Sequence, residues 1–230
     1  MNKIRILVFL LCLSPTLFAQ QTGENQVGAW YMYFGQNRIA EKLSIHSELQ
    51  GRFYNLDNFN QLLARVGLNY HINKEAMLTA GYAYIPTESF EKGSNLKSSI
   101  EHRIWEQFIL KNNVGRVFFE HRYRLEQRWI ENNSNNSKYL NRARYRLMLT
   151  IPLNHETKED KTVYLGIYDE IFLNLTSQPF DQNRLYFALG YKFNKTVDIQ
   201  AGYLKHHYSG LGYDRLQFAL FFNPDLRKKE

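Results

Sequence analysis

Arginine and glutamate alternate with apolar residues along two neighbouring stretches, which hold the chain's most promising chemistry. Between Gly115 and Trp129 the even positions are Arg116, Phe118, Glu120, Arg122, Arg124, Glu126 and Arg128. Between Leu140 and Ile151 they are Arg142, Arg144, Arg146, Met148 and Thr150. A guanidinium binds carboxylate or phosphate through a planar pair of hydrogen bonds, so this face predicts recognition of anions.

The odd positions of the same stretches are mostly apolar or aromatic. They are Val117, Phe119, His121, Tyr123, Leu125, Gln127 and Trp129, then Ala143, Tyr145, Leu147, Leu149 and Ile151. A period of two indicates extended strands with two unlike faces. The sheet is therefore either soluble with one wet face, or apolar towards lipid and charged towards a lumen.

The N-terminus predicts export. Lys3 and Arg5 precede a short apolar run, Pro15 breaks it, and Ala19 offers a small residue for cleavage. We expect residues 1–19 to be a secretory signal peptide, since this run is too short to span a membrane as a helix. The only cysteine, Cys12, lies inside it. The mature chain can therefore form no disulfide and no thiolate metal site.

The mature chain is basic and rich in aromatic residues. Without Lys3 and Arg5 it holds 27 basic and 22 acidic residues, and the chain contains 16 Tyr and 16 Phe. Alternating strands in an exported chain predict an all-β fold, an antiparallel transmembrane β-barrel of the bacterial outer membrane, as a single domain over residues 20–230. The alternative is a secreted soluble β-sandwich or lipocalin-like barrel. Nucleic acid is not an expected partner, because the positive charge alternates with lipid-facing aromatics in an exported protein.

The number of alternating segments differs from the even number of strands that a bacterial barrel normally has. Eleven alternating segments can be counted, whereas a bacterial barrel normally has an even number with both termini periplasmic. We predict ten to twelve strands, with either 26–35 divided in two or a strand hidden in 86–98. Ile100 to Lys111 alternates poorly, which suggests a bulge, and Asn112-Asn113 is expected to form a tight turn.

The segments are expected to be joined by connections of two kinds. Those at Asn73, Asn112 and Asn194 are short, and those at Asn55, Pro86, Asn132, Ser177 and Ser209 tend to be longer. Short periplasmic turns and longer external loops are typical of outer-membrane barrels. The connection at Asn154 is an exception on the periplasmic side. The last strand ends on an aromatic residue, Phe222, which suits recognition by the barrel-assembly machinery.

Several short motifs, in a fixed order, resemble an outer-membrane barrel family of Gram-negative bacteria that is catalogued only as a domain of unknown function. They are Trp30, Glu170-Ile171-Phe172-Leu173-Asn174, Asn183-Arg184-Leu185, Gly190-Tyr191 and Gly202-Tyr203. The resemblance spans nearly the whole mature chain. It implies a membrane barrel and no activity. A weaker likeness is to the oligogalacturonate-specific porins, which are narrow barrels with arginine-lined bores.

Two readings of the polar face remain open. In the first, the inward residues form a track that binds or passes small acidic solutes. Its candidate residues are Arg116, Arg122, Arg124, Arg142, Arg144, Arg146, Arg184, Glu120 and Glu170. In the second, Glu48, Glu120, Glu126 and Glu170 pair with these arginines and close the lumen with a structural network. Seven arginines against four glutamates predict that some positive potential survives.

Other chemistry has weaker support in the sequence. An enzyme at the barrel rim that acts on lipid A or phospholipid would need a nucleophile and a base, and the loop at 206–214 supplies His206, His207, Ser209 and Asp214. We expect no enzyme and no cofactor. We expect no metal site either, because the histidines of four segments (His46, His71, His102 and His121) show no paired spacing. Lipid and the phosphates of lipopolysaccharide are expected partners of the surface.

Overall fold

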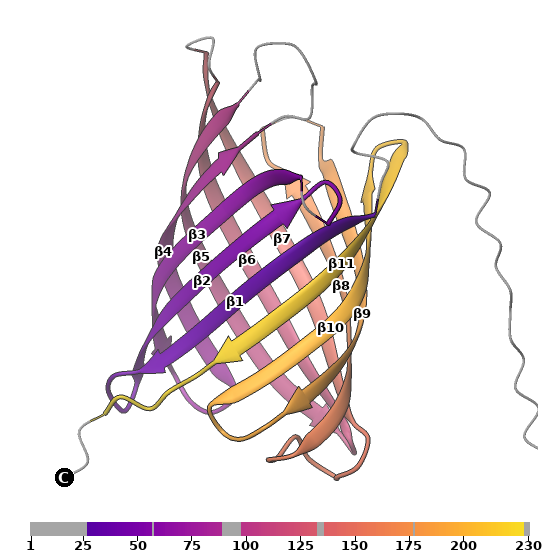
Figure 1. Ribbon diagram of the computed structural model, residues 1–230. Helices are drawn as coiled ribbons and strands as arrows, with labels where there is room; N and C mark the ends of the chain where they lie inside the picture. The colour runs from indigo at the N-terminus through magenta and orange to yellow at the C-terminus, as the bar shows by residue number, and fades with distance from the viewer. Residues whose placement is uncertain (1–26, 57, 89–97, 133–135, 177, 228–230) are drawn as a thin grey trace, which may run out of the picture.

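The computed structural model describes residues 27–56, 58–88, 98–132, 136–176 and 178–227. The expected signal peptide and most of 86–98 lie outside them. The described residues form eleven strands, as follows: β1 (Gly28–Arg38), β2 (Leu43–Phe53), β3 (Phe59–His71), β4 (Ala76–Thr87), β5 (Ser99–Val114), β6 (Val117–Asn132), β7 (Ser137–Pro152), β8 (Thr162–Asn174), β9 (Phe180–Lys192), β10 (Val197–Tyr208) and β11 (Leu211–Phe222). They make one closed barrel (Figure 1).

The barrel closes through a parallel pair. Consecutive strands are antiparallel, whereas β1 and β11 run side by side in the same direction, from Gly28 opposite Arg215 to Gly35 opposite Phe222. An odd number of alternating strands leaves the first and last pointing the same way, so closure must be parallel. The prediction of ten to twelve strands is confirmed, while the expectation of an even number is wrong. Gly28–Arg38 is one continuous strand, not two pieces.

The two ends of the barrel differ. The end that carries the connections 54–58, 88–98, 133–136, 175–179 and 209–210 is called here the loop end. The opposite end, called the turn end, carries 39–42, 72–75, 115–116, 153–161 and 193–196. Figure 1 shows the loop end at the top and the C-terminal trace below. The start of β1 and the finish of β11 therefore lie at opposite ends, which corrects the expectation that both termini share one side.

The wall has the two unlike faces that the alternation predicts. On β6, Arg124 is 3% exposed while its neighbour Leu125 is 50% exposed. The same parity holds on β2 and β9, where Glu48 and Arg184 are buried and Leu49 and Leu189 are exposed. Polar side chains thus fill the inside of the closed sheet and apolar ones cover its outside. Among the described residues, no helix is long and apolar enough to cross a membrane.

Two local predictions are wrong. β5 pairs with β4 and β6 without a register shift, and the irregularities lie instead at Arg52/Phe53 and Phe172/Leu173. The alternation of β5 looked poor because the polar residues His102 and Glu106 lie on its outward face, while Trp105 and Ile109 point into the barrel. The hairpin turn falls at Gly115, whose φ of 56° suits glycine, and Asn112 and Asn113 are paired within β5.

Bulky side chains fill part of the lumen. Trp105 is fully buried, and it fits because Gly67 and Gly81 on the neighbouring strands leave it room. A Cβ on Gly81 would lie 2.8 Å from the indole ring and 2.2 Å from the Val66 carbonyl oxygen. A second apolar cluster joins Trp30, Tyr168, Tyr186, Ala188 and Leu204. Small residues on the inner face of β4, such as Gly81, thus make room for bulky neighbours.

Candidate functional site

The lumen holds a cavity of about 600 Å³ that is lined mainly by charged and amide side chains. Among the described residues its walls carry eleven arginines, at positions 52, 65, 103, 122, 124, 128, 142, 144, 146, 184 and 215, together with Lys111 and Lys158. Five carboxylates share these walls: Glu48, Glu101, Glu120, Glu170 and Asp181. Glu126 and Asp198 lie behind the lining and bring the acids to seven. Thirteen cations against seven acids leave a surplus of six positive charges.

The sheet register places like charges directly opposite one another. Arg122 on β6 faces Arg146 on β7, and Arg124 faces Arg144. Like charges in directly opposed positions destabilise a sheet. The pairs are tolerable only because carboxylates from diagonal positions and from neighbouring strands reach between the guanidinium groups.

Glu126 is the main such carboxylate. Its side chain has no exposed surface, and it accepts hydrogen bonds from three arginines. Arg144 donates at 2.6 Å, Arg142 at 2.6 and 2.9 Å, and Arg103 at 3.1 Å. Arg124 lies 3.9 Å away. One carboxylate thus neutralises part of a group of four cations that three strands bring together.

Glu170 has the same role nearer the middle of the barrel. It accepts hydrogen bonds from Arg122 at 2.7 Å and from Arg144 at 2.7 and 3.1 Å. Glu120, closer to the turn end, accepts one from Arg146 at 2.6 Å. These contacts confirm that the glutamates of the polar face pair with its arginines.

Further ion pairs extend the network around the lumen. Glu48 accepts from Arg65 at 2.7 and 2.9 Å. Glu101 holds both Arg103 and Arg128, and Asp181 accepts from Arg142 at 2.8 Å. The sequence candidates omitted Arg52, Arg65, Arg103, Arg128 and Arg215. For Arg52 and Arg65 the signal was present, because both occupy the polar parity of their strands. For Arg103 the inward Trp105 obscured it.

Arg116 does not belong to the lumen. It lies in the turn between β5 and β6 and donates hydrogen bonds to the backbone carbonyls of Pro152, Leu153 and His155. The other eight candidates, in contrast, all line the cavity. Including Arg116 among them was wrong, because the turn begins three residues later than the Asn112-Asn113 pair suggested.

Three luminal arginines have no hydrogen bond to a carboxylate of the described residues. Arg52 donates to Gln50 and Gln61, Arg124 donates to Gln107, and Arg184 donates to Gln182 and His206. Each guanidinium lies over an aromatic ring instead. Amide oxygens and ring faces are neutral partners for these guanidinium groups, so they add no negative charge.

The long connection at Asn154 folds into the turn end of the lumen. Lys158 reaches the cavity wall, forms an ion pair with Asp198, and lies 3.8 Å from the centre of the Tyr164 ring. Lys192 donates to the backbone carbonyl of Lys158 at 2.9 Å. Burial lowers the pKa of the Lys158 ammonium, and Asp198 opposes that shift. This connection thus places Lys158 against the cavity wall at the turn end.

The residues considered for a rim enzyme point in different directions. His206 and His207 belong to β10 and Asp214 to β11, rather than to a loop. His206 is buried inside the lumen beside Gln182, while Asp214 lies outside and accepts from Lys205 at 2.8 Å. His206 and Asp214 lie on opposite faces of the sheet, so this base and this acid cannot share a proton relay.

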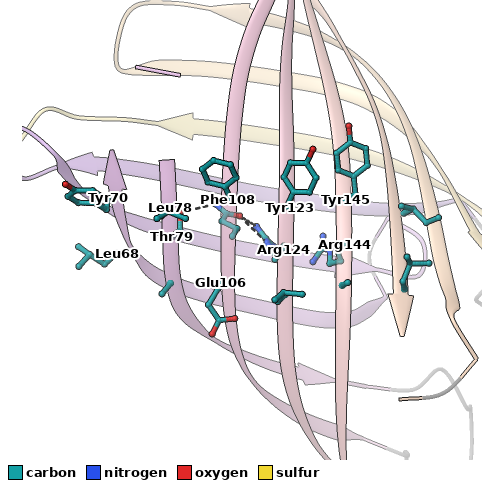
Figure 2. Close-up of a pocket in the computed structure, with 16 residues that line it drawn as sticks. Leu68, Tyr70, Leu78, Thr79, Glu106, Phe108, Tyr123, Arg124, Arg144 and Tyr145 are labelled. Atoms are coloured by element: carbon teal, nitrogen blue, oxygen red, sulfur yellow. Dashed lines mark hydrogen bonds between the residues drawn. The ribbon is translucent and has the colours of Figure 1, made fainter. Parts of the chain in front are cut away.

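The outer face has a shallow apolar hollow of its own, of about 690 Å³. Figure 2 shows the wall around it, with Phe108, Tyr123 and Tyr145 in a row across β5, β6 and β7. Its floor contains Ala80 and Ala143 and one carboxylate, that of Glu106, which accepts from Gln127 at 3.2 Å. Figure 2 also marks the hydrogen bonds of the opposite face, from Arg124 to Gln107 and from Gln107 to Thr79.

The candidate metal ligands stay apart. His46 and His71 point inward, towards Glu48 and Ser44, and His102 and His121 lie beside outward-facing tyrosines. Within the ranges that the structure describes, no three His, Cys, Asp or Glu residues form a group that could hold a metal ion. The arrangement can therefore bind oxyanions through guanidinium groups, and shows no constellation for metal or nucleophilic chemistry among those residues.

Comparison with known proteins identifies a family and adds no activity. No curated protein and no solved structure matches the chain. One family model, described as a protein of unknown function (DUF2490), matches residues 27–217, which is most of the barrel from β1 to β11. The chain therefore belongs to the DUF2490 family of proteins of unknown function.

Proposed function

We propose that this chain is an outer-membrane β-barrel whose arginine-lined lumen binds small anions and passes them across the membrane. The surplus of six positive charges on the luminal walls carries the proposal. Charge of one sign inside a low-dielectric wall concentrates counterions and raises their rate of entry. Phosphates and carboxylates suit such walls, because guanidinium groups bind both in planar geometry.

The outer surface supports a membrane location. Large apolar side chains are exposed all around the wall, including Tyr31, Leu68, Ile104, Phe187 and Phe218. Soluble proteins rarely expose a continuous apolar surface of this size. A closed sheet also leaves no strand edge unpaired, as hydrocarbon requires. Residues 1–19 then act as the export signal, the barrel-assembly machinery inserts the chain, and lipid with lipopolysaccharide surrounds it.

A second candidate is a structural barrel with a closed lumen. It is favoured by Glu126 and Glu170, which tie arginines of neighbouring strands together, and by Lys158 at the turn end. If every guanidinium were paired with a carboxylate, no guanidinium would remain to bind a solute. Arg52, Arg124 and Arg184, which have no carboxylate hydrogen bond, distinguish the two candidates.

Planar-bilayer recording of the purified protein tests the proposal. Under a KCl gradient the anion pathway predicts a zero-current potential close to the equilibrium potential of chloride. Arg124→Gln with Arg184→Gln is expected to move this potential towards that of potassium. Arg227→Gln, a matched change on an exposed residue beyond β11, is expected to leave it unchanged. Cation preference would refute the anion bias, and the absence of any conductance would favour the closed barrel.

A further inference from the structure

We propose that the loop end of the lumen holds a discrete site for a doubly charged oxyanion, formed by Arg52 and Arg184, whose guanidinium groups both lie over the Trp30 ring. This inference rests on the proposed function and names the place and chemistry of its strongest binding step. The two arginines come from β2 and β9, which β1, β11 and β10 separate in the closed sheet, and their side chains converge inside the lumen on Trp30 of β1.

The geometry brings the two guanidinium groups together. The Cζ atom of Arg52 lies 4.2 Å from the centre of the Trp30 ring, and that of Arg184 lies 5.0 Å from the same ring. The two carbons are therefore at most about 9 Å apart. An oxyanion that accepts one hydrogen bond of about 2.8 Å from each guanidinium can bridge a separation of this order.

Neither charge is cancelled by a hydrogen-bonded carboxylate of the described residues. Arg52 is oriented by Gln50 and Gln61, with bonds of 2.6 to 3.0 Å to their amide oxygens. Arg184 has only longer contacts, 3.3 Å to Gln182 and 3.4 Å to His206. The amides hold the guanidinium groups in place without neutralising them. Both guanidinium groups are therefore held in position, and their positive charges are available to a bound anion.

The nearest acidic groups of the network are already engaged. Glu48, two residues from Arg52 on the same strand, binds Arg65. Glu170, which faces Arg184 across β8 and β9, binds Arg122 and Arg144. Both carboxylates therefore form their hydrogen-bonded ion pairs with other arginines.

Burial strengthens the site. Trp30 is 6% exposed, Arg184 8% and His206 3%. Two like charges held this close in a partly desolvated place repel one another strongly, and a bound anion relieves that repulsion. One negative charge would leave a net cation, whereas two balance both arginines. We therefore expect dianions such as hydrogen phosphate or a short dicarboxylate to bind in preference to chloride or acetate.

Binding measurements on the refolded full-length barrel in detergent test the site. Inorganic phosphate and succinate serve as separate probes, so that phosphorus and carbon oxyanions are distinguished, with chloride and acetate as monovalent controls. Arg52→Gln and Arg184→Gln are each expected to weaken dianion binding about tenfold, because a charge-assisted hydrogen bond is worth that much or more. Heat-modifiable gel mobility checks that every variant is folded.

Arg146→Gln removes the same charge from the same lumen, but towards the turn end, where Glu120 also pairs with Lys111. A discrete site predicts a smaller loss of dianion affinity for this variant than for Arg52→Gln or Arg184→Gln. The matched control is Arg227→Gln, on an exposed residue beyond β11, which should leave dianion affinity unchanged. Equal losses in the three luminal variants would show diffuse attraction and overturn the discrete site, as would equal affinity for dianions and monoanions.

Binding and conductance measurements together distinguish a failure of the dianion site from a failure of the anion pathway. Anion selectivity in bilayers without saturable dianion binding would refute the site and leave the proposed function standing. Dianion binding that Arg52→Gln and Arg184→Gln abolish, in a barrel that conducts nothing, would support the site and refute transport.

Discussion

Removing the charge of Glu126 should destabilise the barrel more than any other neutral substitution of similar shape. Glu126→Gln keeps the side-chain volume but leaves Arg103, Arg142 and Arg144 without the oxygen they share. Removing one partner of a buried ion pair costs about 3–5 kcal/mol. Because this carboxylate serves three arginines, the free energy of unfolding should fall by at least about 4 kcal/mol, a large part of the stability of an ordinary domain.

Urea titration of the barrel in detergent, followed by tryptophan fluorescence and by heat-modifiable gel mobility, measures this loss. Glu156→Gln, on an exposed loop residue, should change stability by less than about 0.5 kcal/mol. Adding Arg124→Gln to Glu126→Gln should restore about 1–2 kcal/mol, because one of the crowded cations is then gone. A Glu126→Gln barrel within about 1 kcal/mol of the parent would refute the view that this carboxylate holds the arginines together.

Three further predictions concern the lumen, the packing and the outer face. Asp198→Asn should raise single-channel conductance by freeing Lys158 from the turn end, and unchanged conductance would mean that this contact does not narrow the pore. Gly81→Ala should lower unfolding stability by about 1–3 kcal/mol, whereas Gly51→Ala, on the outward face, should cost little; equal losses would contradict the packing argument. Phe187→Arg should impair membrane assembly in cells, because an arginine on the lipid-facing side costs about 2–4 kcal/mol of insertion free energy. Phe187→Leu is the control, and assembly of Phe187→Arg as efficient as that of Phe187→Leu would argue against a lipid-facing position.

Much of the fold was accessible from the sequence because the alternation of a barrel strand is a local property. The polar parity of 116–128 and 142–150 placed Arg122, Arg124, Arg142, Arg144 and Arg146 on the inner face, as observed. The pattern failed where a large apolar residue turned inward. Trp105 made β5 look irregular, since nothing in its own segment reveals that Gly67 and Gly81 make room for it.

The site itself was only half predictable. Parity tells which residues face the lumen but not which of them meet, because partners depend on register and on closure between β1 and β11. The pairing of Arg124 with Arg144 and of Arg122 with Arg146 follows from one hairpin register. The approach of Arg52 and Arg184 to Trp30 joins three distant segments, and no local pattern encodes it.

Lipid accessibility along β6 tests most directly whether the apolar face meets lipid and the arginines face the lumen. The single native cysteine, Cys12, lies in the expected signal peptide, so single cysteines can be placed at 121, 122, 123, 124 and 125 and labelled with an environment-sensitive fluorophore. In vesicles that contain spin-labelled lipid, quenching should be strong at 121, 123 and 125 and weak at 122 and 124. Quenching of the opposite parity, or uniformly weak quenching, would contradict both the membrane location and the arginine-lined pathway.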